Sequence, residues 1–218
     1  MPMVRSGASV TTGWRQRLPV DSGADVIRTG IGRAVKLIGD YVSSSDPPVR
    51  ANNILALVVA SNQPFYPLYV RTMAGDDGGA SFITLLSTPV FATIPLIARR
   101  NAAWAFALLP VAGIANAMLA TIALGASAGI ELFLIPCALA AMISVYHTGW
   151  KIIAGLTIAM SAIYFALYIS TDNSIAGLNS QELAALYRLN ALSVACLSVF
   201  ILYTFYPVVI APPRSGSK

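Results

Sequence analysis

The order of apolar and polar positions divides most of the chain into long apolar runs separated by short polar segments. Six such runs follow residue 53, at about 54–70, 81–98, 102–124, 130–147, 152–170 and 184–210, the last beginning between residues 184 and 189. Most contain about 17–23 residues, close to the roughly 20 that a helix needs to cross a bilayer. The pattern predicts an all-α polytopic membrane protein with six transmembrane helices in three hairpins.

A different pattern precedes these runs. Between residues 21 and 43 apolar side chains such as Ile27, Ile31, Val35 and Ile38 recur at helical spacing, and basic residues lie off that stripe. We therefore expect an amphipathic juxtamembrane helix at 21–43. Two interpretations stay open: the helix lies in the cytoplasmic leaflet, or it packs on its own protein or on a partner chain.

The remaining segments define the expected domain limits. Residues 1–20 are basic and without periodicity, which is typical of a disordered N-terminus. Residues 44–52 contain the sequence Ser-Ser-Asp-Pro-Pro and are expected to form a linker. The six-helix domain is expected at 53–211, followed by a basic cytoplasmic tail at 212–218.

Charge predicts the orientation. Of the 14 Lys and Arg residues, only Arg71 and Arg188 fall on segments that would be outside if the N-terminus is inside. This bias predicts that both termini are cytoplasmic. The chain is 56% hydrophobic and 11% charged, with a mean hydropathy of +0.70, so lipid is the expected solvent. The net charge of +5 is explained by topology, and we expect no nucleic-acid partner.

The first apolar run is interrupted by polar residues and prolines. Asn62 and Gln63 are followed by Pro64 and Pro67. Proline frees backbone carbonyls in a spanning helix, which is tolerated where neighbouring helices or water satisfy them. Asn62 and Tyr66 are four residues apart and share a helix face, so this face is a candidate ligand wall.

The third run combines small residues with one amide. Gly113, Ala117 and Thr121 repeat at four-residue spacing, which favours close approach of a neighbouring helix. Asn116 lies in the same run and is a further candidate for a polar ligand contact.

Two ionisable residues lie in or beside the fourth run. Glu131 follows the connector Gly125–Gly129 and is expected either to cap the helix that follows or to contact a ligand arriving from outside. His147, the only histidine, is expected at the opposite interface, about 24 Å away along a helix. No catalytic motif is present and one histidine builds no usual metal site, so we expect no enzymatic activity, metal or cofactor. Cys137 and Cys196 are expected to be small apolar side chains.

The connector and the start of the fourth run, Leu124-Gly125-Ala126-Ser127-Ala128-Gly129-Ile130-Glu131-Leu132-Phe133-Leu134, resemble a known group of membrane regions. These are the six-helix membrane domains at the front of bacterial class III adenylate cyclases and of related diguanylate cyclases and sensor histidine kinases. The resemblance implies a membrane sensor that reads a small lipophilic ligand or a state of the membrane. Since the sequence ends at Lys218, it implies a form without the catalytic domain.

These observations lead to one preferred expectation and two alternatives. We expect a sensor or anchor module of a bacterial inner membrane, with the bilayer, a lipophilic small molecule, and a signalling partner or second copy of the chain as partners. The alternatives are a small transporter or channel component and an assembly or scaffold subunit. The expected ligand-binding residues are Asn62, Gln63, Tyr66, Asn116 and Glu131.

Overall fold

The computed structural model describes residues 23–147, 150–170 and 175–210, and these form helices and no strand. The predicted disordered N-terminus, the predicted tail and the side chain of His147 lie outside the described residues. The chain divides into two compact units, residues 1–40 and 41–218. The first contains nearly all of α1 (Gly23–Val42), as expected from its periodicity. Side chains from Ile27 to Asp40 are exposed, including Ile27, Ile31, Val35 and Ile38 of the apolar stripe.

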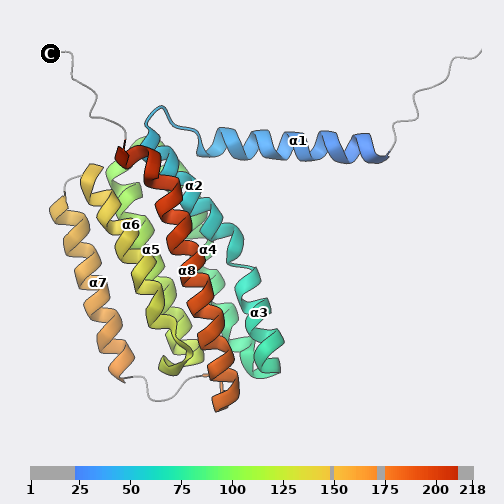
Figure 1. Ribbon diagram of the computed structural model, residues 1–218, viewed down its shortest axis with the longest axis vertical. Coiled ribbons are helices and arrows are strands. Elements are labelled where there is room, and N and C mark those ends of the chain that lie inside the picture. Colours follow the sequence, from blue (N-terminus) through green and yellow to red (C-terminus); the bar gives the residue numbers. More distant parts are fainter. Residues whose placement is uncertain (1–22, 148–149, 171–174, 211–218) are drawn as a thin grey trace, which may run out of the picture. The chain divides into compact units, whose positions relative to one another are not determined.

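The second unit is a helical bundle (Figure 1). Its elements are α2 (Pro47–Asn62), α3 (Phe65–Ala74), the 3₁₀ helix η1 (Gly75–Ser87), α4 (Thr88–Arg100), α5 (Ala102–Leu124), the short 3₁₀ helices η2 (Ala126–Ala128) and η3 (Ile130–Phe133), α6 (Leu134–His147), α7 (Trp150–Ser170) and α8 (Ser180–Ile210).

The helix α2 begins earlier than expected. It starts at Pro47, inside the predicted linker, because proline at the first helical position has a preset φ and no N–H to satisfy. At the other end, α2 and α3 are separated by Gln63 and Pro64, where the sequence placed a break. A turn at Gly75, with φ of 59°, then reverses the chain, so that α4 packs on α2 and η1 packs on α3.

Residues 71–80 lie between the first two predicted apolar runs, and their sequence Arg-Thr-Met-Ala-Gly-Asp-Asp-Gly-Gly-Ala predicts a solvated loop. In the structure they are helical. The helix α3 continues to Ala74, and η1 then runs for 13 residues. A 3₁₀ helix has three residues per turn, so residues three apart eclipse one another. In η1 every third residue is small, and Gly78, Ser81, Thr84 and Ser87 are all buried. The hydroxyls of Ser81 and Thr84 donate to the carbonyls three residues earlier, at 2.6 and 2.8 Å, and the Ser87 hydroxyl lies 2.8 Å from the carbonyl of Thr84. This ladder stabilises the unusual length of η1.

Within residues 23–147, 150–170 and 175–210, three helical stretches are long and apolar enough to cross a membrane. They are Pro47–Arg100, which joins α2, α3, η1 and α4, then Ala102–Leu124 and Ser180–Val208. Two shorter apolar helices, Ile130–Ser144 and Ile153–Ile169, accompany them. The expected all-α membrane class is therefore supported, with three rather than six helices meeting the length criterion. The two numbers differ partly because Pro47–Arg100 counts as one helical stretch. Its two ends, α2 and α4, nevertheless pack side by side.

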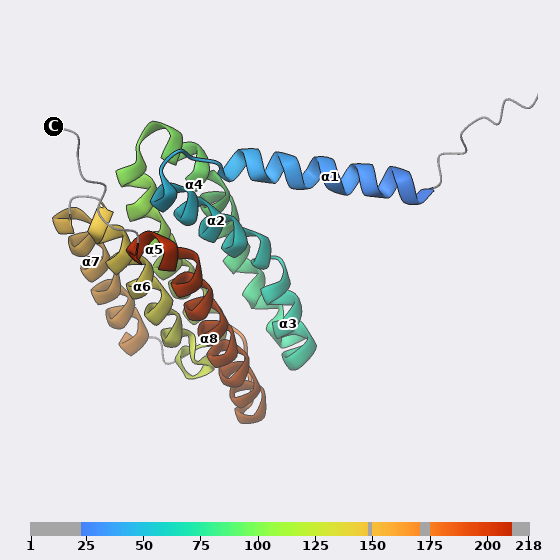
Figure 2. The same cartoon turned by 45° about the horizontal axis from the view of Figure 1, so that its top comes forward.

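The bundle has two hydrophobic clusters rather than one. The first joins α2, α4, the first half of α5, the second half of α6, the start of α7 and the end of α8. The second joins α3, the second half of α5, the connector, α7 and the start of α8. Helix α7 packs on α5 and α6 at one edge of the bundle (Figure 2). A cavity lies where the two clusters meet.

Candidate ligand cavity

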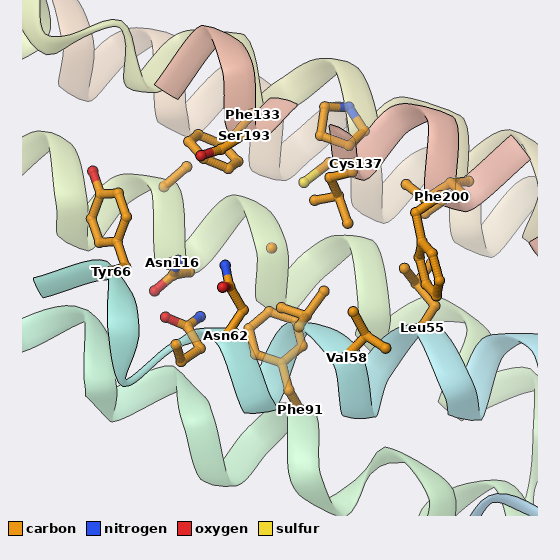
Figure 3. Close-up of a pocket in the computed structure, with 18 of the residues that line it drawn as sticks. Leu55, Val58, Asn62, Tyr66, Phe91, Asn116, Phe133, Cys137, Ser193 and Phe200 are labelled. Carbon is orange, nitrogen blue, oxygen red and sulfur yellow. The ribbon is translucent and has the colours of Figure 1, made fainter. Parts of the chain in front are cut away.

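The cavity is enclosed by helices that are far apart in the sequence. Its volume is about 660 Å³, and its wall comes from α2, α3, α4, α5, η3, α6 and α8. This volume is within the usual range for small-molecule sites, roughly 300–1,000 Å³. Most of the wall is apolar, with Leu55, Phe91, Leu109 and Phe200 among the larger side chains (Figure 3).

Four of the five predicted ligand-binding residues lie in this wall. Asn62, Gln63, Tyr66 and Asn116 all line the cavity, although they come from three different helical segments. The break between α2 and α3 and the position of Asn116 on the facing side of α5 bring them together. Whether they bind a ligand stays a prediction; their convergence on one cavity is a structural finding.

Two of these residues are held by a polar cluster. The Nε2 of buried Gln63 donates to the Oγ of Ser87 at 2.9 Å, and that Oγ lies 2.8 Å from Oδ1 of Asn116. The hydroxyl also lies 2.8 Å from the carbonyl of Thr84. Since a hydroxyl has one proton, Ser87 donates to one of these two acceptors at a time. The cluster ties α2, η1 and α5 together beside the cavity.

The other two keep hydrogen-bonding capacity. The Asn62 side chain is exposed and, within the described part of the chain, makes no hydrogen bond. The Tyr66 hydroxyl is buried and has no hydrogen-bond partner there. It faces the side chain of Asn190 on α8, but outside standard hydrogen-bond geometry. A ligand in the cavity would therefore meet one amide that is not already used, that of Asn62, whereas the Tyr66 hydroxyl is closed off by burial.

Asn190 also fixes the connector. Its Nδ2 donates to the carbonyl of Ala128 at 2.8 Å, and its Oδ1 is buried without a partner. The next residue, Gly129, has a φ of 78°, which favours glycine. A Cβ at Gly129 would lie 2.6 Å from the ring of Tyr187, so the connector packs tightly on α8.

The fifth predicted residue, Glu131, lies elsewhere. It is half-buried in η3 and does not line the cavity. It lies in the first turn of η3, where the helix dipole favours a carboxylate, and its buried Oε2 has no hydrogen-bond partner. The carboxylate is close enough to Tyr164 for an electrostatic interaction, and the Tyr164 hydroxyl is 3.1 Å from Oγ1 of Thr121. Glu131 therefore stands at a helix start, as the first of its two expected roles requires, and apart from the wall that the other four predicted residues line.

Sequence reasoning missed several residues of the site. Ser87 links two predicted residues, Ser193 lines the cavity from α8, and Asn190 faces Tyr66. The isolated amide in the last apolar run was a usable signal for Asn190, because polar side chains in spans form interhelical hydrogen bonds.

Both cysteines are free and line the same cavity, with Cys137 half-buried and Cys196 exposed. Among the described residues, no group of three or more His, Cys, Asp or Glu side chains could hold a metal ion. The site therefore offers amide and hydroxyl groups in an apolar wall. Comparisons of the chain with protein-family models, with curated proteins and with solved structures find no match to it.

Proposed function

We propose that this protein is a membrane sensor or anchor module that binds a small lipophilic ligand in the cavity between the two hydrophobic clusters. The observation that carries the proposal is the composition of the cavity wall. It is apolar over most of its area, and Asn62, Gln63, Tyr66 and Asn116 contribute polar groups. Ligand sites commonly combine an apolar wall with a few placed polar groups.

The proposal includes six membrane crossings, formed by α2–α3, η1–α4, α5, η3–α6, α7 and α8. The exposed faces of α7 and α8 support it, because both carry large apolar side chains that water would solvate poorly. On α7 these include Ile158, at 70% exposure, and Ile169, at 77%. The distribution of Lys and Arg supports an inner-membrane protein with both termini cytoplasmic.

A contact at the end of α1 supplies a route for output. The Tyr41 hydroxyl donates to the carbonyl of Ala92 at 2.6 Å, and the Arg99 guanidinium lies 5.6 Å from the Tyr41 ring centre. Arg99 also donates to the Tyr41 carbonyl at 3.3 Å. Phe91, next to Ala92 on α4, is part of the cavity wall. A ligand that shifts α4 would therefore act on the residue through which α1 joins the bundle.

The resemblance of residues 124–134 to cyclase and kinase membrane domains fits this class of function. Under the proposal, the partner that receives the output is a cyclase, a kinase or a second copy of the chain. Co-purification from the native membrane with either kind of enzyme would support this part.

Photo-crosslinking tests ligand binding. The protein in lipid nanodiscs is exposed to a lipophilic diazirine, and the labelled peptides are identified by mass spectrometry. We expect labels in the cavity wall, reduced in the Asn62→Leu variant. Glu131→Gln is the matched control outside the cavity and should label like the wild type. If Asn62→Leu and the wild type label alike, the site is misplaced.

One observation favours transport as the second candidate. The helix break at Gln63 and Pro64 adjoins the cavity, and transporters often build midplane sites on broken helices. Single cysteines introduced along residues 62–71 can be labelled from each side of the membrane. Accessibility that alternates with substrate would favour transport, and accessibility from one side would favour a sensor.

A further inference from the structure

We propose that the cavity takes a single-chain amphiphile with an uncharged, hydrogen-bonding head, and that this molecule enters from the bilayer between α2–α3 and α8. The inference rests on the proposed function and names the chemistry of its ligand and the route by which it arrives. Three features of the cavity wall carry it: the absence of charged residues among those described, the distribution of polar groups and the position of the exposed residues.

The wall lacks formal charge. Among the described residues that line the cavity, none is Asp, Glu, Lys, Arg or His. A charged head would have no counter-ion there, and burying an unpaired charge in an apolar site is strongly unfavourable. Glu131, the one charged residue among the five predicted ligand-binding residues, is not part of the wall. The site therefore favours an alcohol, ketone, amide or similar neutral head.

The polar groups gather at one end. Asn62, Tyr66 and Asn116 lie together in the view of Figure 3, and Leu55 and Phe200 lie at the opposite end. The seven residue steps from Leu55 to Asn62 correspond to roughly 10 Å along a helix at about 1.5 Å per residue. A neutral head beside Asn62 would thus have its chain extended along an apolar path toward Phe200.

The head would find a free partner in Asn62. Gln63 and Asn116 are engaged with Ser87, but the exposed Asn62 amide is not hydrogen-bonded in the described part of the chain. The amide supplies both donors and an acceptor. The Tyr66 hydroxyl also lacks a partner, but its oxygen is buried, so the ring of Tyr66 forms the wall there. A hydroxyl or carbonyl head could satisfy the Asn62 amide, which an apolar molecule cannot do.

Among the described residues, the exposed part of the wall lies on α2, α3 and α8. The wall residues from α4, α5 and α6 are buried or half-buried. The exposed wall residues are Val58, Ser61 and Asn62 on α2, Phe65 on α3, and Leu192 and Cys196 on α8. The mouth of the cavity is therefore the interval between α2–α3 and α8.

This mouth lies between helices that touch one another elsewhere. Both α2 and α3 contact α8, and the Tyr66 side chain of α3 faces Asn190 of α8. The opening thus lies along the side of the bundle, and three of its exposed residues, Val58, Phe65 and Leu192, are apolar. A side opening with an apolar rim suits a molecule already dissolved in lipid.

Three photoreactive probes test the head chemistry. They share one alkyl chain with a diazirine and end in a hydroxyl, a sulfonate or a trimethylammonium group, whose charges do not change with pH. Labelling of the cavity wall is divided by labelling of the exposed face of α7, residues 158–169, which reports partition into the membrane. We expect this ratio to be at least about tenfold higher for the alcohol than for either charged probe, since an unpaired buried charge costs more than the 1.4 kcal/mol that corresponds to tenfold.

The outcomes separate this inference from the proposed function. A charged probe that matches or exceeds the alcohol overturns the head assignment and leaves a lipophile site in place. If none of the three probes labels the cavity above the α7 face, both the inference and the proposed function fail.

Tryptophan variants test the side opening. Val58→Trp and Leu192→Trp add bulk at exposed positions on the two sides of the mouth, and neither position is part of the buried core. Each should slow the growth of cavity labelling after mixing by about tenfold, as a barrier raised by about 1.4 kcal/mol would. Leu202→Trp, at an exposed α8 position outside the wall, is the control. Wild-type rates in both mouth variants would show that the ligand arrives by another route.

Discussion

The closest approach of α5 and α6 gives a quantitative test of the packing. A Cβ on Gly113 would lie 2.6 Å from Sγ of Cys137. Carbon atoms pack best at about 3.5–4.0 Å, so Gly113→Ala creates an overlap of about 1 Å. Overpacking of this kind typically costs about 1–3 kcal/mol. Cys137→Ala removes the sulfur that causes the clash and alone should cost about 1 kcal/mol for the small void that it leaves.

The double variant is the informative one. The alanine methyl at 113 would occupy part of the space vacated by the Cys137 sulfur, so the double variant should be more stable than the sum of the single effects by about 1–2 kcal/mol. Independent sites add within about 0.3–0.5 kcal/mol, which sets the resolution required. The measurement is reversible unfolding in mixed micelles with SDS, followed by far-UV circular dichroism.

A matched glycine controls for helix propensity. A Cβ on Gly155 in α7 meets no other atom within 4 Å. Gly155→Ala should therefore be neutral or stabilising, by up to about 1 kcal/mol. Strict additivity of Gly113→Ala and Cys137→Ala would refute the close approach. Equal destabilisation by Gly113→Ala and Gly155→Ala would also contradict it.

Three further predictions concern polar contacts and α1. Ser87→Ala removes the shared partner of Gln63 and should destabilise the bundle by about 1–2 kcal/mol in the same unfolding assay, with part of the loss recovered when Gln63→Met is added. Tyr41→Phe removes the hydrogen bond to Ala92 and should lower local stability by about 0.5–1.5 kcal/mol, measured as faster hydrogen exchange in residues 41–46; unchanged exchange would argue against the contact. Hydrogen exchange of α1 should be slower in nanodiscs that contain anionic lipid than in zwitterionic nanodiscs. In the Ile31→Lys variant, exchange in anionic nanodiscs should return to the rate seen in zwitterionic lipid. Protection that does not depend on lipid charge would favour packing of α1 on protein instead.

The helical architecture was largely predictable because apolar runs record contact with lipid or core. Helix α5 covers the same residues as the third predicted run. The ends of α1 differ from the predicted ends by a residue or two. The prediction was wrong at residues 71–80. Asp76 and Asp77 beside glycines are typical of a loop, and the three-residue period of small side chains that builds η1 is invisible to hydropathy.

The candidate site was predictable only as far as depth in the membrane. Polar residues such as Asn62 and Asn116 stand out in apolar runs, and they do line one cavity. Glu131 was grouped with them because it was expected on the same side of the membrane. Its lateral position depends on the order of helices around the bundle, which a single sequence does not encode. Ser87 was missed because serine is unremarkable in a spanning helix until its partners are known.

The 3₁₀ geometry of η1 sets the rule by which this part of the chain can change length. The thirteen residues of η1, at about 2.0 Å each, extend roughly 26 Å, whereas an α-helix with the same number of residues would extend about 20 Å. One inserted residue would turn Ser87 by about 120° away from Asn116, and only a unit of three would restore the hydroxyl to the same azimuth. Insertions or deletions in η1, natural or engineered, should therefore be tolerated best in multiples of three residues.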